Sequence, residues 1–196
     1  GGRARLALDR EAMEARSAVV PAPKGAPPEA VYTAVGCGAP PQGSGIRVRI
    51  VDPETCAPLE QRSLAAWASG GAATSAVGEI WLASRSVADG YWGGGHAAPE
   101  AEALTKLAFH GVVKGEEGSG ELWLRTGDLG FLHGGELFVC GRVKDLIIVR
   151  GRNHWPQDLE RTAERAVQEL RPGCTAAFAV DAAAVGPRAA AAPPPG

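Results

Sequence analysis

The chain has 196 residues, with 20 lysine and arginine residues against 22 aspartate and glutamate residues, and a net charge of -2. That length fits one large domain, or one lobe together with part of another. The nearly neutral charge excludes a general electrostatic attraction to nucleic acid or to an anionic membrane. Since the sequence contains no apolar run of about 18 residues and no charged and then apolar leader, we expect no membrane span and a cytoplasmic protein.

Metal-binding and disulfide patterns are also absent from the sequence. The cysteines are widely spaced and contain no CxxC pair, which favours free thiols in a reducing compartment over a zinc site or a disulfide framework. The four histidines show no HxxxH or other ligand spacing, so we expect no metal site built from protein residues. The cysteines are Cys37, Cys56, Cys140 and Cys174.

The first part of the chain predicts one helix and one strand separated by irregular connections. Leu6–Val19 has the pattern of a short helix, which the proline-rich surface connection Pro21–Pro28 ends. Ile46–Val51 alternates apolar and basic residues with a period of two, which is typical of a half-buried strand, and Asp52–Thr55 supplies a turn. Leu59–Ala76 has no apolar stripe, so we expect an irregular segment there.

The central part predicts a small antiparallel sheet. Val77–Ala83 is predicted as a second strand, and Pro99–Leu104 as a first helical turn whose acidic residues lie near the positive end of the helix. From Leu122 to Val149, short apolar runs are separated by glycines, with a turn at His133–Gly135. The runs are 122–124, 130–132, 136–139 and 146–149.

The C-terminal part predicts one helix and one strand. Pro156–Leu170 begins with a proline, which is favoured in a first turn, and repeats apolar residues on one helical face. Thr175–Val180 is predicted as a strand. The alanine and proline residues that follow lack the apolar side chains needed to order a segment.

Three motifs in the second half carry the strongest functional signal. Arg125–Asp128 is Arg-Thr-Gly-Asp, Gly141–Asp145 is Gly-Arg-Val-Lys-Asp, and Arg150–Glu160 contains Arg-Gly-Arg-Asn-His followed by Pro-Gln-Asp. In this order and spacing they resemble the adenylate-forming enzymes, which activate a carboxylic acid with ATP. The Asn-His-Trp-Pro-Gln-Asp version resembles the fatty acyl-AMP ligases in particular. The resemblance covers roughly residues 35–180.

The resemblance implies an α+β fold, with a distorted antiparallel β-barrel subdomain of an adenylate-forming enzyme followed by the start of its small C-terminal α/β domain. We accordingly expect an irregular or helical lead-in at residues 1–29 and the β subdomain of the large AMP-binding domain at 30–142. The start of the small domain is expected at 143–181, and a disordered Ala/Pro tail at 182–196.

Asp128 is the first candidate nucleotide-binding residue. A carboxylate offers two acceptor oxygens to a vicinal diol, which is how the ribose of adenosine presents its hydroxyls. The resemblance gives the matching aspartate this role, and Gly127 would let the backbone approach the ligand closely. The alternative is that Thr-Gly-Asp is only a turn with a capping carboxylate.

Arg142 and Lys144 are the other two candidates that the resemblance brings. Arg142 carries a planar, always-charged group that can bridge ribose and phosphate oxygens, and the alternative is a surface basic residue after a strand. Lys144 matches the hinge about which the family's small domain pivots, and the alternative is a solvated loop lysine. A hinge needs only a residue whose backbone angles can change, so the lysine side chain itself specifies little.

Other residues receive structural predictions. Glu79 is expected as an exposed charge at a strand edge. The basic cluster around Arg150 and Arg152 lacks an aromatic stacking platform, so it predicts no nucleic-acid partner. The tryptophans are expected as core or interface anchors. Those considered are Trp81, Trp92, Trp123 and Trp155.

The resemblance implies a function that these residues would not carry out alone. The family uses a Ser/Thr/Gly-rich loop that ends in lysine, which we expect upstream of Gly1, and a lysine near the C-terminus, whereas the sequence has no lysine after Lys144. Since the first residue is not methionine, we expect a fragment of an ATP-dependent ligase, and since the C-terminal lysine is absent, we expect this fragment to be inactive. The intact enzyme would use ATP and Mg²⁺ to form a fatty acyl-adenylate for transfer to an acyl carrier protein thiol. The alternative is a non-catalytic remnant or interaction module that keeps the fold.

Overall fold

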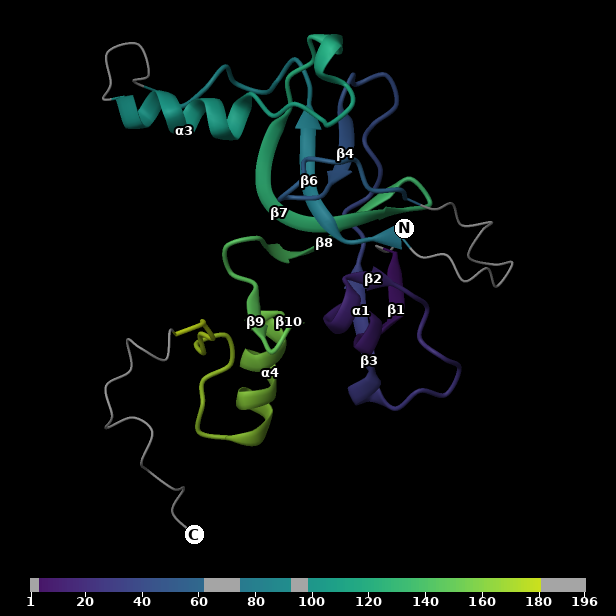
Figure 1. The fold of residues 1–196 in the computed structure, drawn as a ribbon. Coiled ribbons are helices and arrows are strands. Elements are labelled where there is room, and N and C mark those ends of the chain that lie inside the picture. The colour runs from purple at the N-terminus through teal and green to yellow at the C-terminus, as the bar shows by residue number, and fades with distance from the viewer. Residues whose placement is uncertain (1–3, 62–74, 93–98, 181–196) are drawn as a thin grey trace. The chain divides into compact units, whose positions relative to one another are not determined.

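Figure 1 shows the computed structural model of the protein, which describes residues 4–61, 75–92 and 99–180. The chain divides into two compact units, Gly1–Lys144 and Asp145–Gly196. All strand pairs within the described residues are antiparallel, and helices are interspersed between the strands. The predicted α+β class with antiparallel sheets is therefore confirmed.

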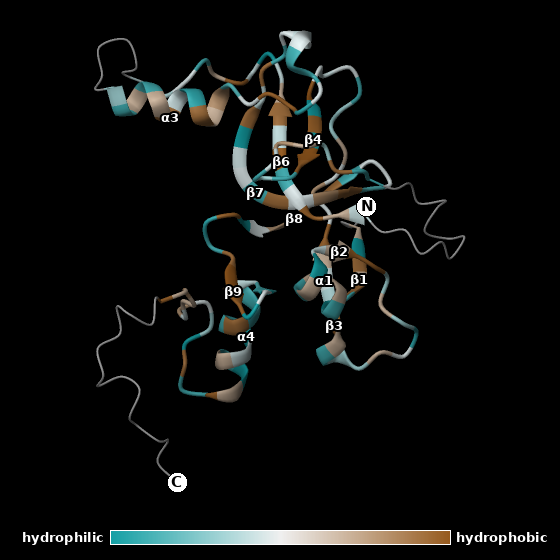
Figure 2. Cartoon of the chain, in the orientation of Figure 1, coloured by the Kyte–Doolittle hydropathy of each residue, from teal (hydrophilic) through white to brown (hydrophobic). Residues whose placement is uncertain are grey.

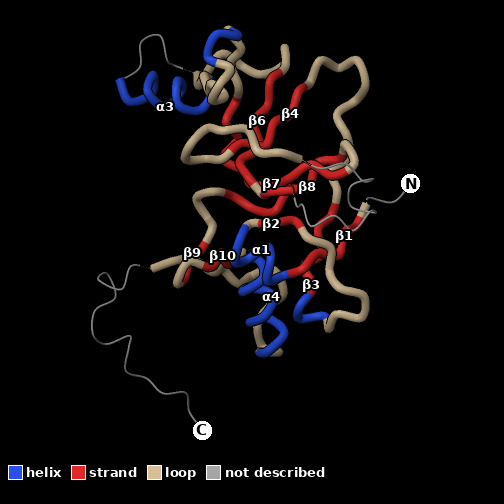
Figure 3. The backbone as a smooth tube through the Cα atoms, turned by 45° about the vertical axis from the view of Figure 1, so that its right-hand side comes forward, coloured by secondary structure: helices blue, strands red, loops and turns tan. Residues whose placement is uncertain are grey.

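The first unit contains a four-stranded sheet in the order β4-β6-β7-β8 (Figure 3). Its strands are β4 (Arg47–Val51), β6 (Gly78–Ala83), β7 (Leu124–His133) and β8 (Glu136–Arg142). The strands predicted at 46–51 and 77–83 are confirmed, as is the turn between β7 and β8. Successive side chains of β6 are buried, which shows that both faces of this strand are covered.

The core of this sheet is built around two tryptophans, and Figure 2 shows hydrophobic residues recurring along the strands. Trp81 and Trp123 are almost fully buried, as is Trp155 in the second unit, so the prediction that they are core residues is confirmed. Trp92 is instead fully exposed. The core cluster consists of Val51, Trp81, Ala83, Val113 and Trp123.

The N-terminal segment contains a strand before its helix. β1 (Arg5–Asp9) precedes α1 (Arg10–Arg16) and pairs with β3 (Val31–Val35). The single helix predicted at Leu6–Val19 is therefore wrong. The side chain of Asp9 accepts a hydrogen bond from a first-turn N–H at 2.7 Å, so the helix begins after it, while the backbone before it belongs to the ladder with β3.

The predicted connection Pro21–Pro28 contains only an isolated bridge at Pro21 and the start of a short 3₁₀ helix, η1 (Pro28–Ala30). Beyond β3, the N–H of Cys37 donates to Leu137 O at 2.7 Å. β8 is an edge strand of the four-stranded sheet, and this bond joins it to the chain that follows β3. The N-terminal strands and the four-stranded sheet therefore belong to one hydrogen-bonded unit.

The region between β4 and β6 is described only at its ends. Most of the predicted irregular segment Leu59–Ala76 lies outside the described residues, which omit 62–74. At its end is a two-residue strand, β5 (Ser75–Ala76), which pairs with β2 (Ala18–Val19). The backbone N–H groups of this short strand thus find partners in the N-terminal segment.

Between β6 and β7 the chain forms α3 (Pro99–Phe109) and a short 3₁₀ helix, η2 (Glu117–Ser119). The first helical turn predicted at Pro99–Leu104 is confirmed and extends to Phe109. None of the residues of α3 is buried. No helix within the described parts of the chain is long and apolar enough to cross a membrane.

The second unit begins with a separate hairpin. β9 (Ile147–Val149) pairs with β10 (Arg152–His154), with Arg150 at a positive φ of 52° in the turn between them. The expectation that the apolar run at 146–149 belongs to the same sheet as 122–139 is therefore wrong. The partner of β9 is the polar sequence that follows it directly, and an apolar pattern does not identify a polar partner.

α4 (Pro156–Ala166) confirms the predicted helix at 156–170 but ends one turn earlier. The predicted strand at Thr175–Val180 is wrong, because this segment has no strand partner among the described residues. Its Ala177 N–H is instead bonded to the carboxylate of Glu160 on α4 at 3.0 Å. The predicted disordered tail at 182–196 lies outside the described residues.

Candidate nucleotide-binding site

The Thr-Gly-Asp motif forms a bulge in β7. On β6 a single residue, Ile80, lies between two paired positions, whereas on β7 the three residues Thr126–Asp128 lie between the corresponding positions. The flanking pairs are Trp81 with Arg125 and Glu79 with Leu129. Such an insertion bends a strand and redirects its side chains, so the motif is displaced from the regular ladder.

Hydrogen bonds within the motif fix the shape of this bulge. The hydroxyl of Thr126 donates to Ile80 O at 2.7 Å and accepts from the N–H of Asp128 at 3.0 Å. Gly127 has a φ of 73°, a conformation that glycine adopts without the steric cost that a side chain would add. Threonine and glycine thus shape the bulge, and the carboxylate of Asp128 is not the group that closes it.

Glu79 lies under the bulge and bonds to it directly. Its Oε2 accepts from Arg125 Nε at 3.2 Å and Nη2 at 2.9 Å, and its Oε1 accepts from the N–H of Gly127 at 3.1 Å. The expectation of an exposed strand-edge charge is wrong, because Glu79 is 3% exposed on a strand with neighbours on both sides. The available signal was an acid among apolar strand residues together with an arginine beside Thr-Gly-Asp.

The structure brings Asp128 and Arg142 together. They are cross-strand partners at the end of the β7–β8 ladder, and Arg142 Nε lies 3.1 Å from Asp128 Oδ1. Their side chains are 40% and 64% exposed, respectively, so a ligand can reach both. The pair therefore places a carboxylate and a guanidinium side by side on an accessible surface.

Lys144 follows this pair after two residues. It is exposed, lies in a turn after β8 and is the last residue of the first unit. One residue before it, the N–H of Val143 donates to Gly127 O at 2.8 Å, which joins the end of β8 to the bulge. The role of Lys144 as a hinge stays a prediction.

Comparison with known proteins places this geometry in a family. The chain is 42% identical over 185 residues to the medium-chain-fatty-acid–[acyl-carrier-protein] ligase JamA of Moorena producens. The aligned region covers 92% of this chain and 26% of JamA. A solved structure from a study of fatty acyl-adenylate ligases of E. coli and L. pneumophila superposes with a TM-score of 0.64 at 32% identity, over 91% of this chain and 26% of that one. The chain belongs to the adenylate-forming ligases.

Further relatives agree with that placement. The long-chain-fatty-acid–AMP ligase FadD32 of Mycolicibacterium smegmatis is 43% identical over 114 residues, which is 54% of this chain and 17% of the relative. A fatty acyl-adenylate ligase from L. pneumophila, in complex with acyl adenylate and pyrophosphate, superposes with a TM-score of 0.53 at 36% identity, over 91% of this chain and 26% of that one. No family model matches the chain. The chain thus spans about a quarter of the length of JamA and of the two solved enzymes.

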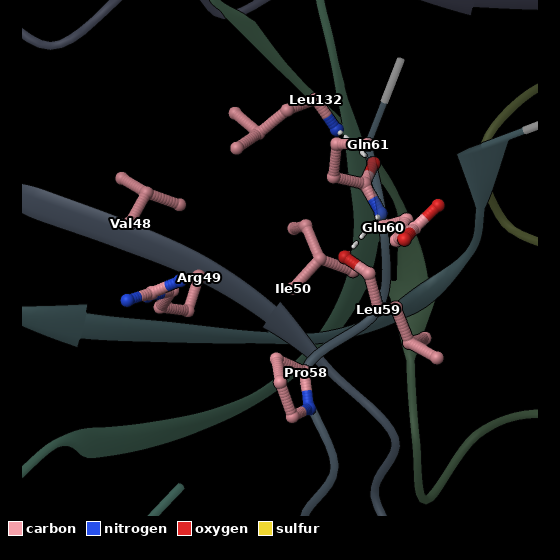
Figure 4. Close-up of a pocket in the computed structure, with 8 residues that line it drawn as sticks. All are labelled: Val48, Arg49, Ile50, Pro58, Leu59, Glu60, Gln61 and Leu132. Carbon is pink, nitrogen blue, oxygen red and sulfur yellow. Dashed lines mark hydrogen bonds between the residues drawn. The ribbon is translucent and has the colours of Figure 1, made fainter. Parts of the chain in front are cut away.

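A cavity of about 340 Å³ opens beside β4, on residues other than those of the Asp128 site (Figure 4). Gln61 closes one side of it, because its side chain accepts from Leu132 N–H at 2.9 Å and donates to Ala76 O at 3.1 Å. The amide of Gln61 is thus occupied in joining β5 to β7. The lining residues are Val48, Arg49, Ile50, Pro58, Leu59, Glu60, Gln61 and Leu132.

The described residues of the chain contain no group of three or more His, Cys, Asp or Glu side chains that could hold a metal ion. Mg²⁺ that neutralises a nucleotide is commonly held by one or two carboxylates together with the phosphate oxygens. All four cysteines are free thiols.

Proposed function

We propose that this chain is the C-terminal part of the large AMP-binding domain, and the start of the small domain, of an ATP-dependent fatty acyl-AMP ligase. The intact enzyme would join a fatty acid to AMP and release pyrophosphate, and would then transfer the acyl group to the phosphopantetheine thiol of an acyl carrier protein. ATP would bring Mg²⁺ with it. A cytoplasmic location fits this use of ATP.

The observation that carries the proposal is the accessible Asp128–Arg142 pair on the Thr-Gly-Asp bulge. The two oxygens of Asp128 can accept hydrogen bonds from the two ribose hydroxyls. Arg142, beside it, can then bridge ribose and phosphate oxygens with its fixed set of donors. The similarity to fatty acyl-adenylate ligases supports the same ligand.

The 196 residues would not perform this reaction without the rest of the enzyme. They contain no lysine after Lys144, whereas the family uses a lysine near its C-terminus to stabilise charge that develops on the α-phosphate. We propose that the phosphate-binding loop and the acyl site are contributed by the remaining sequence of the longer protein. The alternative is a non-catalytic remnant or interaction module that keeps the fold.

The test is ATP–pyrophosphate exchange by the longest natural protein that contains this chain, with a panel of fatty acids of increasing length. Exchange that depends on a fatty acid supports the ligase. A folded protein that binds no nucleotide and shows no exchange with any fatty acid would instead support the non-catalytic module. The 196-residue chain serves as the control and is expected to be inactive.

A further inference from the structure

We propose that Glu79 and Arg125 are positioning residues for the nucleotide, and that their ion pair holds the Thr-Gly-Asp bulge in the shape that presents Asp128. The inference rests on the proposed function, since it assigns two more residues to the same site. Their effect is exerted through the backbone of Gly127, and neither side chain needs to touch the ligand.

Glu79 uses both carboxylate oxygens to connect the ion pair to the bulge. Oε2 accepts from Arg125 at 2.9 and 3.2 Å, while Oε1 accepts from Gly127 N–H at 3.1 Å. The Glu79 side chain is only 4% exposed, and water therefore competes little for these charge-assisted bonds. A displacement of this carboxylate is transmitted to Gly127, which immediately precedes Asp128.

Arg125 is itself fixed on several sides, so that the pair is a rigid support. Its Nη2 also donates to Pro53 O at 3.2 Å, and its Cζ lies 5.3 Å from the centroid of the Trp81 ring. The turn that carries Pro53 is held by the carboxylate of Asp52, which accepts from the N–H of Thr55 at 2.7 Å. That hydrogen bond lowers the pKa of the Asp52 carboxyl.

The sheet also offers an ion pair of the same chemistry away from the bulge. Arg49 on β4 bonds through Nη2 to Glu116 at 3.1 Å, and these side chains are 45% and 32% exposed. An exposed pair of this kind contributes little to stability. It provides the matched control for removal of a glutamate charge.

The experiment compares four variants of the longest natural protein that contains this chain. Glu79→Gln keeps the length of the side chain and one acceptor oxygen but places an amide donor against the guanidinium, while Glu79→Asp keeps the charge and shortens the reach. Arg125→Lys keeps a charge but loses the planar fork. Glu116→Gln is the control. The measurements are kcat, KM for ATP and KM for the fatty acid in pyrophosphate exchange, and deuterium uptake by peptides from the bulge and from β4.

We expect Glu79→Gln and Arg125→Lys to raise the KM for ATP by roughly 10- to 100-fold, because a misplacement of about 1 Å in a positioned group can cost about 100-fold. The KM for the fatty acid should stay constant, deuterium uptake should rise in the bulge peptide only, and Glu79→Asp should be intermediate. Glu116→Gln should change none of these quantities.

Two results would overturn the inference while leaving the proposed function intact. One is an active wild-type enzyme in which Glu79→Gln leaves the KM for ATP unchanged. The other is an equal change in both KM values together with faster exchange throughout the sheet, which would show a general structural role. A wild-type protein without any exchange activity would overturn the proposed function itself, and the nucleotide role of the pair with it.

Discussion

Asp128 is the single residue whose replacement is expected to affect nucleotide binding most directly. In the longer enzyme, Asp128→Ala removes the acceptors for the ribose hydroxyls, and a lost charge-assisted hydrogen bond costs about 1.5–3 kcal/mol. We expect ATP to bind roughly 10- to 100-fold more weakly per lost bond. Isothermal titration of ATP is the measurement. Asp128→Asn keeps one oxygen and should be milder, and an unchanged affinity in the alanine variant would contradict the ribose assignment.

The cysteines are expected to differ widely in reactivity. Burial raises the pKa of the Cys140 thiol to about 12, whereas Cys37 and Cys174 are exposed. Since the thiolate is the reacting form, about one Cys140 in ten thousand is reactive at pH 8. Iodoacetamide followed by peptide mass mapping should therefore label Cys37 and Cys174 first, and Cys140 only after denaturation. Equal labelling of Cys140 in the native protein would show that the β8 region opens.

At the scale of single residues, the sequence motifs singled out Asp128 and Arg142, which the structure places side by side, whereas the prediction for Glu79 was wrong. The motifs that carry them, Arg125–Asp128 and Gly141–Asp145, are local in the sequence and have a recognisable order and spacing. The role of Glu79 depends instead on which residue of β7 lies opposite it, and Arg125 is 46 positions away along the chain. That contact follows from strand register, which local patterns do not determine when a bulge intervenes.

At the scale of elements, a residue without a side chain is expected to be required at Gly130, where β7 lies close to both of its neighbouring strands, β6 and β8. A Cβ at Gly130 would lie 2.3 Å from Phe138 O on β8 and 2.8 Å from Ile80 Cδ1 on β6. Gly130→Ala should therefore separate the strands and lower the free energy of unfolding by about 3 kcal/mol. Urea unfolding measures the change.

Gly118→Ala is the control for that substitution. A Cβ at Gly118 would meet nothing within 4 Å, so the free energy of unfolding should change by at most about 0.5 kcal/mol. Equal losses in the two variants would mean that the close approach at Gly130 is not what limits the sheet.

The elements that could be predicted are those whose own residues carry the signal. Alternation identified β4, and the proline start and apolar repeat identified α4. The N-terminal strand β1 was missed because its pattern suits a helix until a partner, β3, is known. The segment 175–180 was instead predicted as a strand from its apolar residues, but it has no partner strand among the described residues. Pairing supplies most of the stability of a strand, and pairing is not a local property.

At the scale of the whole molecule, Lys144 provides a test of the two-step reaction. Lys144→Pro fixes φ at about -65° and removes a backbone donor, so it should prevent the backbone changes that a hinge requires. In the longer enzyme, pyrophosphate exchange should persist while acyl transfer to the carrier thiol falls steeply. Separate assays of the two steps provide the measurement.

Lys144→Ala is the matched control, because it removes the side chain and keeps the freedom of the backbone. It should support both steps. Equal loss of both steps in the proline variant would indicate general destabilisation, and no loss in either would place the pivot elsewhere.

The bond from Val143 N–H to Gly127 O joins the end of β8 to the Thr-Gly-Asp bulge. It secures the end of β8 just before the unit boundary, and Asp128, Arg142 and their supports all lie on one side of that boundary. The proposed nucleotide-binding residues should therefore keep their arrangement during a change of the backbone angles at Lys144. An acyl-adenylate is a mixed anhydride that water hydrolyses, and under the proposed function we expect the first unit to retain the adenosine part of this intermediate while the backbone at Lys144 changes.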